Sequence, residues 1–169
     1  AWEAIKVAKD SRIHVFTSTS EIHMEHMLRK SKDEILKDTK ESVKYAKKLC
    51  EDVEFSAQDA TRTDKDFLIE VLKTAVEEGA TTINVPDTVG YATPQDYLEL
   101  LTQVYEQVKG GNEDVIISTH CHNDLGLAVA NSLTAINAGA RQIEGAINGI
   151  GERAGNTSTE EIIMAVKTR

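Results

Sequence analysis

Basic residues, cysteines and long apolar runs are all scarce in this sequence. The 169 residues carry 19 Lys and Arg against 28 Asp and Glu, a net charge of −9, which argues against a nucleic-acid partner. Two cysteines, Cys50 and Cys121, are too few for a disulfide framework and suit a reducing compartment. No 18 apolar residues run together, so we expect no transmembrane helix and no membrane partner.

The composition of the chain indicates one globular domain. Hydrophobic residues make up 40% of the chain and charged residues 28%, a balance that excludes intrinsic disorder. Residues 1–6 are amphipathic, without the basic and then apolar regions of a secretory signal. We therefore expect a cytoplasmic protein.

Helical and strand patterns alternate along the chain. Apolar spacing and capping signals predict helices, and short β-rich runs between them predict strands. Ser31 and Glu34 have the spacing of a capping box, and Pro94 follows Thr93 as at a helix start. The expected helices are 33–50, 64–78, 93–108, 125–138 and 159–168, with 1–9 as the tail of another, and the expected strands are 13–17, 53–56, 81–85, 115–119 and 142–147.

This alternation predicts an α/β fold with a parallel sheet, which two architectures share. In a doubly wound sheet the site lies at one switch point, whereas a (β/α)8 barrel gathers side chains from many strand ends. Polar residues follow nearly every expected strand, so the pattern favours the barrel. A barrel needs about 250 residues, and five strands in 169 residues therefore predict a partial (β/α)8 TIM barrel.

His120 and His122 give the strongest local signal for chemistry. They end an apolar strand, and residues i and i+2 of a strand face the same side, so two imidazoles can meet one cation while Cys121 faces away. Imidazole with oxygen ligands suits Zn, Mn, Fe or Co, and Mg where oxygens dominate. A hydrogen-bonded histidine pair is the alternative.

A glycine-rich segment, 148–156, follows the next strand. Its spacing differs from a dinucleotide fingerprint, and alone it predicts a turn. Asn156 offers a side-chain oxygen to a metal, and Glu152 can act as an acid, a base or an ion-pair partner. Residues 84–90 also fit a plain turn, because Asp87 follows a proline and precedes Gly90.

Taken together, several segments resemble the 2-isopropylmalate synthase family, within the metal-dependent group that includes homocitrate synthases, citramalate synthases and 3-hydroxy-3-methylglutaryl-CoA lyases. The resemblance covers essentially the whole chain. It rests on the segments Thr17–Met24, Phe55–Ala60, Ile83–Tyr91, His120–Gly126, Ala130–Ser132 and Glu144–Asn156.

The resemblance implies that the chain holds about strands four to eight of a catalytic barrel, with the first three strands and any regulatory domain outside residues 1–169. It assigns His120, His122 and Asn156 to a divalent metal (Mn, Zn or Mg), with an aspartate of strand one as fourth ligand. Thr88 matches a threonine that contacts the carboxylate of a 2-oxo acid, and Glu152 a glutamate near the reacting centre. Ser56, Asn123 and Asp124 fall among the substrate-binding motifs, and Gln58 stands where many relatives have glutamate.

The implied activity is a metal-assisted, Claisen-type condensation of acetyl-CoA with 2-oxoisovalerate in leucine biosynthesis, followed by thioester hydrolysis. Two alternatives stay open: a citramalate or homocitrate synthase, and a non-catalytic half-barrel that serves as an assembly module. A nucleotide-binding domain is disfavoured because no phosphate loop is present. The open edges of a five-stranded sheet favour pairing with another chain, and we expect a homodimer.

Overall fold

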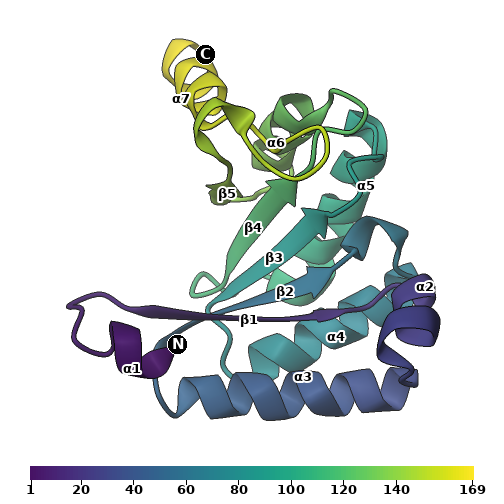
Figure 1. Ribbon diagram of the computed structural model, residues 1–169, viewed down its shortest axis with the longest axis vertical. Coiled ribbons are helices and arrows are strands. Elements are labelled where there is room, and N and C mark those ends of the chain that lie inside the picture. The colour runs from purple at the N-terminus through teal and green to yellow at the C-terminus, as the bar shows by residue number, and fades with distance from the viewer.

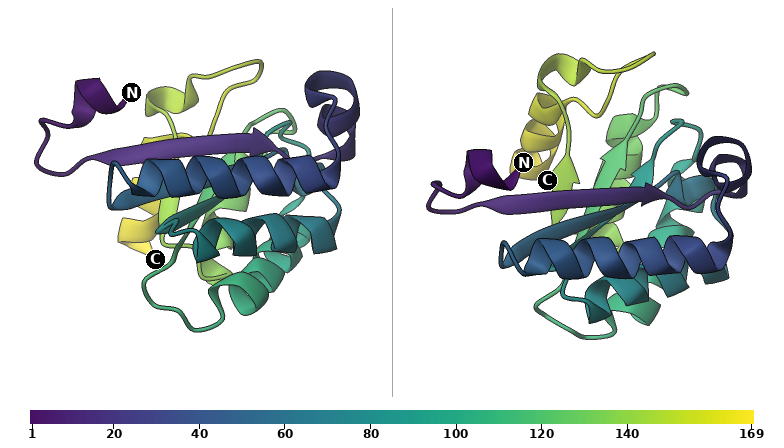
Figure 2. Two further views of the ribbon diagram at one scale, coloured as in Figure 1. Left: turned by 90° about the horizontal axis from the view of Figure 1, so that it is seen from below. Right: turned by 60° about the horizontal axis from the view of Figure 1, so that its bottom comes forward.

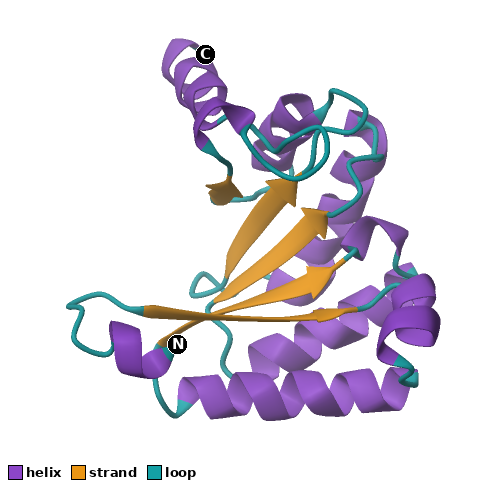
Figure 3. Cartoon of the chain, viewed as in Figure 1, coloured by secondary structure: helices purple, strands orange, loops and turns teal.

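One parallel sheet organises the chain in the computed structural model, which describes all residues 1–169 (Figures 1 and 3). Neighbouring strands pair in parallel in the order of the sequence, which confirms the predicted α/β fold. The last strand is shorter than predicted, because Ala146 leaves it to bridge Ser158. The strands are β1 (Arg12–Ser18), β2 (Asp52–Gln58), β3 (Thr82–Asp87), β4 (Ile116–Cys121) and β5 (Gln142–Glu144).

Helices connect the strands, and two of them begin at the predicted caps Ser31 and Thr93. Ser31 and Glu34 form the expected capping box, and Thr93 forms another with Asp96. The first residues form only one short helix. The helices are α1 (Trp2–Ile5), α2 (Glu21–His23), α3 (Lys32–Lys47), α4 (Lys65–Glu77), α5 (Pro94–Val104), α6 (Ala128–Asn137) and α7 (Thr159–Thr168), with π-helical turns at 24–28 and 105–109 and 3₁₀ turns at 60–62 and 147–149.

The sixth helix begins three residues later than predicted. The Asn123 side chain accepts a hydrogen bond from the Ala128 amide at 3.2 Å, and Gly126 has a φ of +72°. Residues 123–127 are therefore a turn beyond the end of β4 rather than helix. None of the helices is long and apolar enough to cross a membrane.

The core lies between the sheet and helices α3, α4, α5 and α6, which cover one of its faces (Figures 1 and 2). Phe55, Ile83 and Ile117 face these helices from three adjacent strands and are almost wholly buried. Burying each such side chain contributes about 1.5–3 kcal/mol. This layer fixes the strands whose other face carries the candidate site.

The opposite face of the sheet is polar and concave. Arg12 of β1 donates a hydrogen bond to Gln142 of β5 at 2.6 Å, although these strands form the two edges of the sheet. Their side chains can meet only because the sheet curves, as in the wall of a barrel. The residues of this concave face include Arg12, His14, Phe16, Glu54, Ser56, Asn84, Ser118, His120, Gln142 and Glu144.

Candidate active site

The two histidines lie at the carboxyl end of β4, close together. The ring centroids of His120 and His122 are 5.1 Å apart. Cys121, between them in sequence, is fully buried among helix-side residues, where its sulfur lies 3.4 Å from the hydroxyl of Thr119. The alternation of β4 therefore separates the thiol from the imidazoles, as predicted.

The glycine-rich segment brings Asn156 to His122. These two residues form an isolated antiparallel bridge, and the Asn123 amide donates to the Gly155 carbonyl at 2.9 Å. A Cβ at Gly151 would lie 2.5 Å from the side-chain nitrogen of Asn156. Gly151 thus leaves the space that this amide occupies.

Two buried polar atoms of this group have no hydrogen-bond partner: His122 Nδ1 and Asn156 Oδ1. Such atoms are costly to bury unless something binds them. Burial lowers the pKa of His122, as do the nearby His120 and Arg153, so the imidazole is held neutral with a free lone pair. An imidazole nitrogen and an amide oxygen are donors that divalent metals accept, so the residues fit a metal.

The chain supplies few metal donors beyond these. No group of three or more His, Cys, Asp or Glu side chains is arranged to hold a metal ion. The candidate metal ligands are therefore the imidazoles of His120 and His122 and the amide oxygen of Asn156. Three protein ligands leave coordination positions of a metal open to substrate and to further ligands.

His120 is anchored by Glu144, its register partner on β5. His120 Nδ1 lies 3.0 Å from Glu144 Oε2. Burial opposes ionisation of Glu144, but the hydrogen bonds from His120 and Glu54 and the charges of His120 and His14 together outweigh it and lower the pKa of Glu144 to about 2. Burial and the adjacent Glu144 raise the pKa of Glu54 to about 7.

Thr88 and Asp124 are joined by Arg153, a residue that the sequence reading did not single out. Arg153 Nη2 donates to the Thr88 carbonyl and to Asp124 Oδ2, both at 2.8 Å, and its Nε donates to Asp124 Oδ1 at 2.8 Å. The Thr88 hydroxyl accepts a hydrogen bond from the Asp59 amide at 2.9 Å. Its own hydrogen therefore remains available to an acceptor such as a carboxylate.

Ser56 lies deeper in the concave face, beside another missed residue, His14. His14 Nε2 lies 2.6 Å from the Ser56 hydroxyl, and the Asn84 amide donates to the same hydroxyl at 2.9 Å. Burial lowers the pKa of His14. His14 carries no local sequence signal, because its contact with Ser56 depends on the pairing of β1 with β2.

The remaining candidates lie at the rim. Glu152 is exposed, and no side-chain hydrogen bond holds it. The Asn123 side chain is engaged as the turn acceptor before α6, and Gln58 Oε1 accepts from the Ser18 hydroxyl at 2.5 Å. Asp87 is fully buried, and its carbonyl accepts a hydrogen bond from the Gly90 amide at 3.2 Å, so residues 87–90 form a turn.

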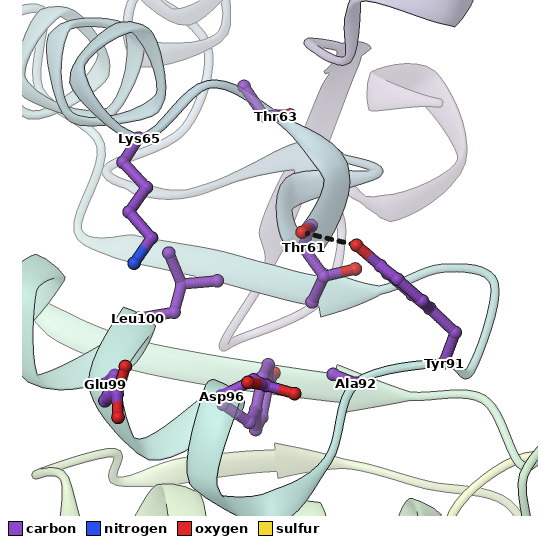
Figure 4. A pocket seen from close by; sticks show the side chains of 9 residues that line it. Thr61, Thr63, Lys65, Tyr91, Ala92, Asp96, Glu99 and Leu100 are labelled. Carbon is purple, nitrogen blue, oxygen red and sulfur yellow. Dashed lines mark hydrogen bonds between the residues drawn. The ribbon is translucent and has the colours of Figure 1, made fainter.

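A separate cavity of about 220 Å³ lies between the start of α4, the start of α5 and Tyr91 (Figure 4). The Tyr91 hydroxyl donates to the Thr61 carbonyl at 3.2 Å across one side of it. None of the three candidate metal ligands lines this cavity.

Comparison with known sequences places the whole chain in one group. The family model described as HMGL-like matches residues 1–169. The chain is 57% identical over 169 residues to a 2-isopropylmalate synthase of Clostridium kluyveri, and 56% identical to one of Pelotomaculum thermopropionicum. Both matches cover 100% of this chain and 33% of the relative, so the chain spans about a third of the length of these curated relatives.

Solved structures share the fold at low sequence identity. A hydroxymethylglutaryl-CoA lyase from Pseudomonas aeruginosa superposes with a TM-score of 0.82 at 18% identity, covering 99% of this chain and 58% of that one. An HMG-CoA lyase from Brucella melitensis gives a TM-score of 0.80 at 17% identity, covering 99% of this chain and 62% of the other. The five-stranded sheet is thus part of a TIM barrel, as the strand pattern predicted.

Proposed function

The chain belongs to the HMGL-like family, and we propose that it forms part of the catalytic barrel of a 2-isopropylmalate synthase-like transferase. The reaction would condense acetyl-CoA with 2-oxoisovalerate, as a step of leucine biosynthesis. Identity of 54–57% to curated synthases along the chain supports this proposal. The remaining strands of the barrel would lie outside residues 1–169.

The observation that carries the proposal is the pair of partnerless buried atoms, His122 Nδ1 and Asn156 Oδ1, beside His120. We assign His120, His122 and Asn156 as the ligands of a divalent metal (Mn, Zn or Mg). When bound, the metal would act as a Lewis acid on the carbonyl of the 2-oxo acid.

Thr88 would bind the carboxylate of the 2-oxo acid. Its hydroxyl accepts from the Asp59 amide, and this orients the free O–H. Ser56 would bind substrate from the concave face, where His14 and Asn84 hold its hydroxyl. Asn123 and Asp124 would shape the rim of the same site, because Arg153 joins Asp124 to the Thr88 backbone.

Glu152 would move a proton during the reaction, since its carboxylate is exposed and no side-chain hydrogen bond engages it. Gln58 has no ionisable group, so the acid or base role that a glutamate could have there is absent. Removing the proton from the acetyl methyl group then depends on another residue.

Release of coenzyme A tests this function. The protein expressed from its natural gene is mixed with acetyl-CoA and a 2-oxo acid, and free thiol is followed with a chromogenic disulfide. We expect release with 2-oxoisovalerate that exceeds release with pyruvate or 2-oxoglutarate, and loss of release in His122→Ala. Faster release with pyruvate or 2-oxoglutarate would support a citramalate or homocitrate synthase instead.

A second candidate function is a non-catalytic assembly module. The observation that favours it is that β1 and β5 each pair on one side only, which leaves two unpaired strand edges. We propose a homodimer in either case, and sedimentation equilibrium tests it. Coenzyme A release by the natural gene product would exclude the assembly module.

The state of the two cysteines bears on the cellular compartment of the protein. Both cysteines, Cys50 and Cys121, are free and buried, as suits a reducing compartment. We propose that the protein works in the cytoplasm.

A further inference from the structure

The contact between His120 and Glu144 determines which nitrogen of the imidazole is free. Glu144 Oε2 lies 3.0 Å from His120 Nδ1. An ionised carboxylate only accepts hydrogen bonds, so Nδ1 must carry the hydrogen. The lone pair of the neutral ring is then on Nε2, and the hydrogen bond fixes the direction of that lone pair.

The other oxygen of Glu144 is held independently. Glu144 Oε1 accepts from the Ser118 hydroxyl and from the Gln142 side-chain amide, both at 3.3 Å. Gln142 is fixed in turn, because its carbonyl oxygen accepts from Arg12 Nη1 at 2.6 Å. The carboxylate therefore has one oxygen anchored to the strands and one aimed at the histidine.

Only one of the two histidines has a carboxylate partner. His122 Nδ1 is buried without a partner, and no carboxylate orients that ring. His120 is half-buried at the open edge of the site, where an unanchored ring would be free to turn. Glu144 thus anchors His120, the less buried of the two rings.

We propose that Glu144 is a positioning residue that holds His120 with Nε2 directed to the metal. The inference rests on the proposed function, since it takes His120 to be a metal ligand. Carboxylate partners of ligating histidines fix the tautomer and ring orientation in this way, and losing one typically costs 10–100-fold in metal affinity or activity.

Zinc affinity tests the inference directly. Metal-free protein from the natural gene is titrated with Zn²⁺ against a chromophoric chelator. We expect Glu144→Ala to weaken zinc binding about 10–100-fold. Glu144→Gln keeps a carbonyl acceptor at the same place, so its loss should be smaller, about 3–10-fold on the same basis.

The control is Glu113→Gln, which changes a carboxylate that is 86% exposed and pairs with Lys109, in contact with neither Glu144 nor His120. We expect its zinc affinity to stay within twofold of the wild type. Thermal unfolding without metal identifies any variant that does not fold. If Glu144→Ala is one of these, the near-isosteric Glu144→Gln carries the test.

A second variant separates this inference from the proposed function. His120→Ala should lose zinc binding, and retention of wild-type affinity would overturn the metal site and with it the role of Glu144. If His120→Ala loses affinity but both Glu144 variants that fold stay within twofold of the wild type, the inference alone is overturned. A stepwise loss from Glu144→Gln to Glu144→Ala supports it.

Discussion

Arg12 and Gln142 lie on the two edge strands of the sheet, yet Arg12 Nη1 donates to Gln142 Oε1 at 2.6 Å across the concave face. The same guanidinium contacts Asp52 at 2.8 Å and the buried Glu54 at 3.0 Å. One cation thus connects three strands at the amino-end side of the sheet. This contact stabilises the curvature that brings β4 and β5 to face the candidate site.

Replacing Arg12 by methionine should destabilise the protein. The change leaves the Glu54 carboxylate without its cation, and we expect a loss of about 1–2 kcal/mol in the free energy of unfolding. Urea denaturation measures it. Lys37→Met is the control, because its partner Glu41 is 67% exposed and such pairs contribute little. Equal effects of the two changes would contradict the role given to Arg12.

The contribution of Glu54 to the stability of the protein should fall as pH rises through the pKa of this residue. Burial and Glu144 raise this pKa from its ordinary value of 4.5 to about 7, so the folded state binds more protons than the unfolded state between these values. The contribution of Glu54 to the free energy of unfolding should therefore decrease over this window, by roughly 1–3 kcal/mol. The difference between the urea midpoints of the wild type and of Glu54→Gln, measured at pH 5 and at pH 7.5, checks the direction.

Glu54→Gln removes the titrating group and should flatten this pH dependence. Glu113→Gln, at a side chain that is 86% exposed, should leave it unchanged. A Glu54→Gln profile parallel to that of the wild type would show that other groups cause the change.

Gly90 is expected to tolerate no side chain. Its φ is +63°, and a Cβ there would lie 2.5 Å from Asp124 Oδ2 and 2.7 Å from the Asp124 backbone nitrogen. Gly90→Ala should cost about 2–4 kcal/mol of stability. Gly126→Ala is the matched control, since its φ is +72° but nothing lies within 4 Å of its Cβ, and it should cost only about 1 kcal/mol. Denaturation that ranks the two variants in the reverse order contradicts the model of this turn.

Arg153 should affect substrate binding more than stability. It joins Asp124 to the carbonyl of Thr88, but its side chain is 45% exposed, and exposed ion pairs contribute about 0–1 kcal/mol. We expect Arg153→Ala to raise the KM for the 2-oxo acid about tenfold, a loss of about 1.4 kcal/mol in binding, with a small change in the melting temperature. Steady-state kinetics with thermal unfolding separate the two effects, and an unchanged KM would exclude this role.

The sequence predicted the alternating elements well because their signals are local. The capping box at Ser31 and the alternation around His120 depend only on neighbouring residues. His14, Glu144 and Arg153 gave no such signal. The contact of Glu144 with His120 depends on the register of β4 and β5, and that of Arg12 with Gln142 depends on curvature, neither of which a single sequence specifies.

The lengths of the elements were harder to predict than their order. The last strand ends at Glu144 because Ala146 pairs with Ser158, a residue from beyond the glycine-rich segment. The start of α6 is delayed by the side chain of Asn123. The first effect comes from a contact between separate segments, and the second from a side-chain hydrogen bond within a local turn.

We propose that His120, His122 and Asn156 hold one divalent metal. Anomalous diffraction from crystals of the natural gene product grown with Zn²⁺, recorded on both sides of the zinc absorption edge, tests this assignment. We expect one peak within about 2.0–2.2 Å of a nitrogen of each histidine and of Asn156 Oδ1. A fully occupied zinc peak elsewhere, with none between these three side chains, would contradict the claim.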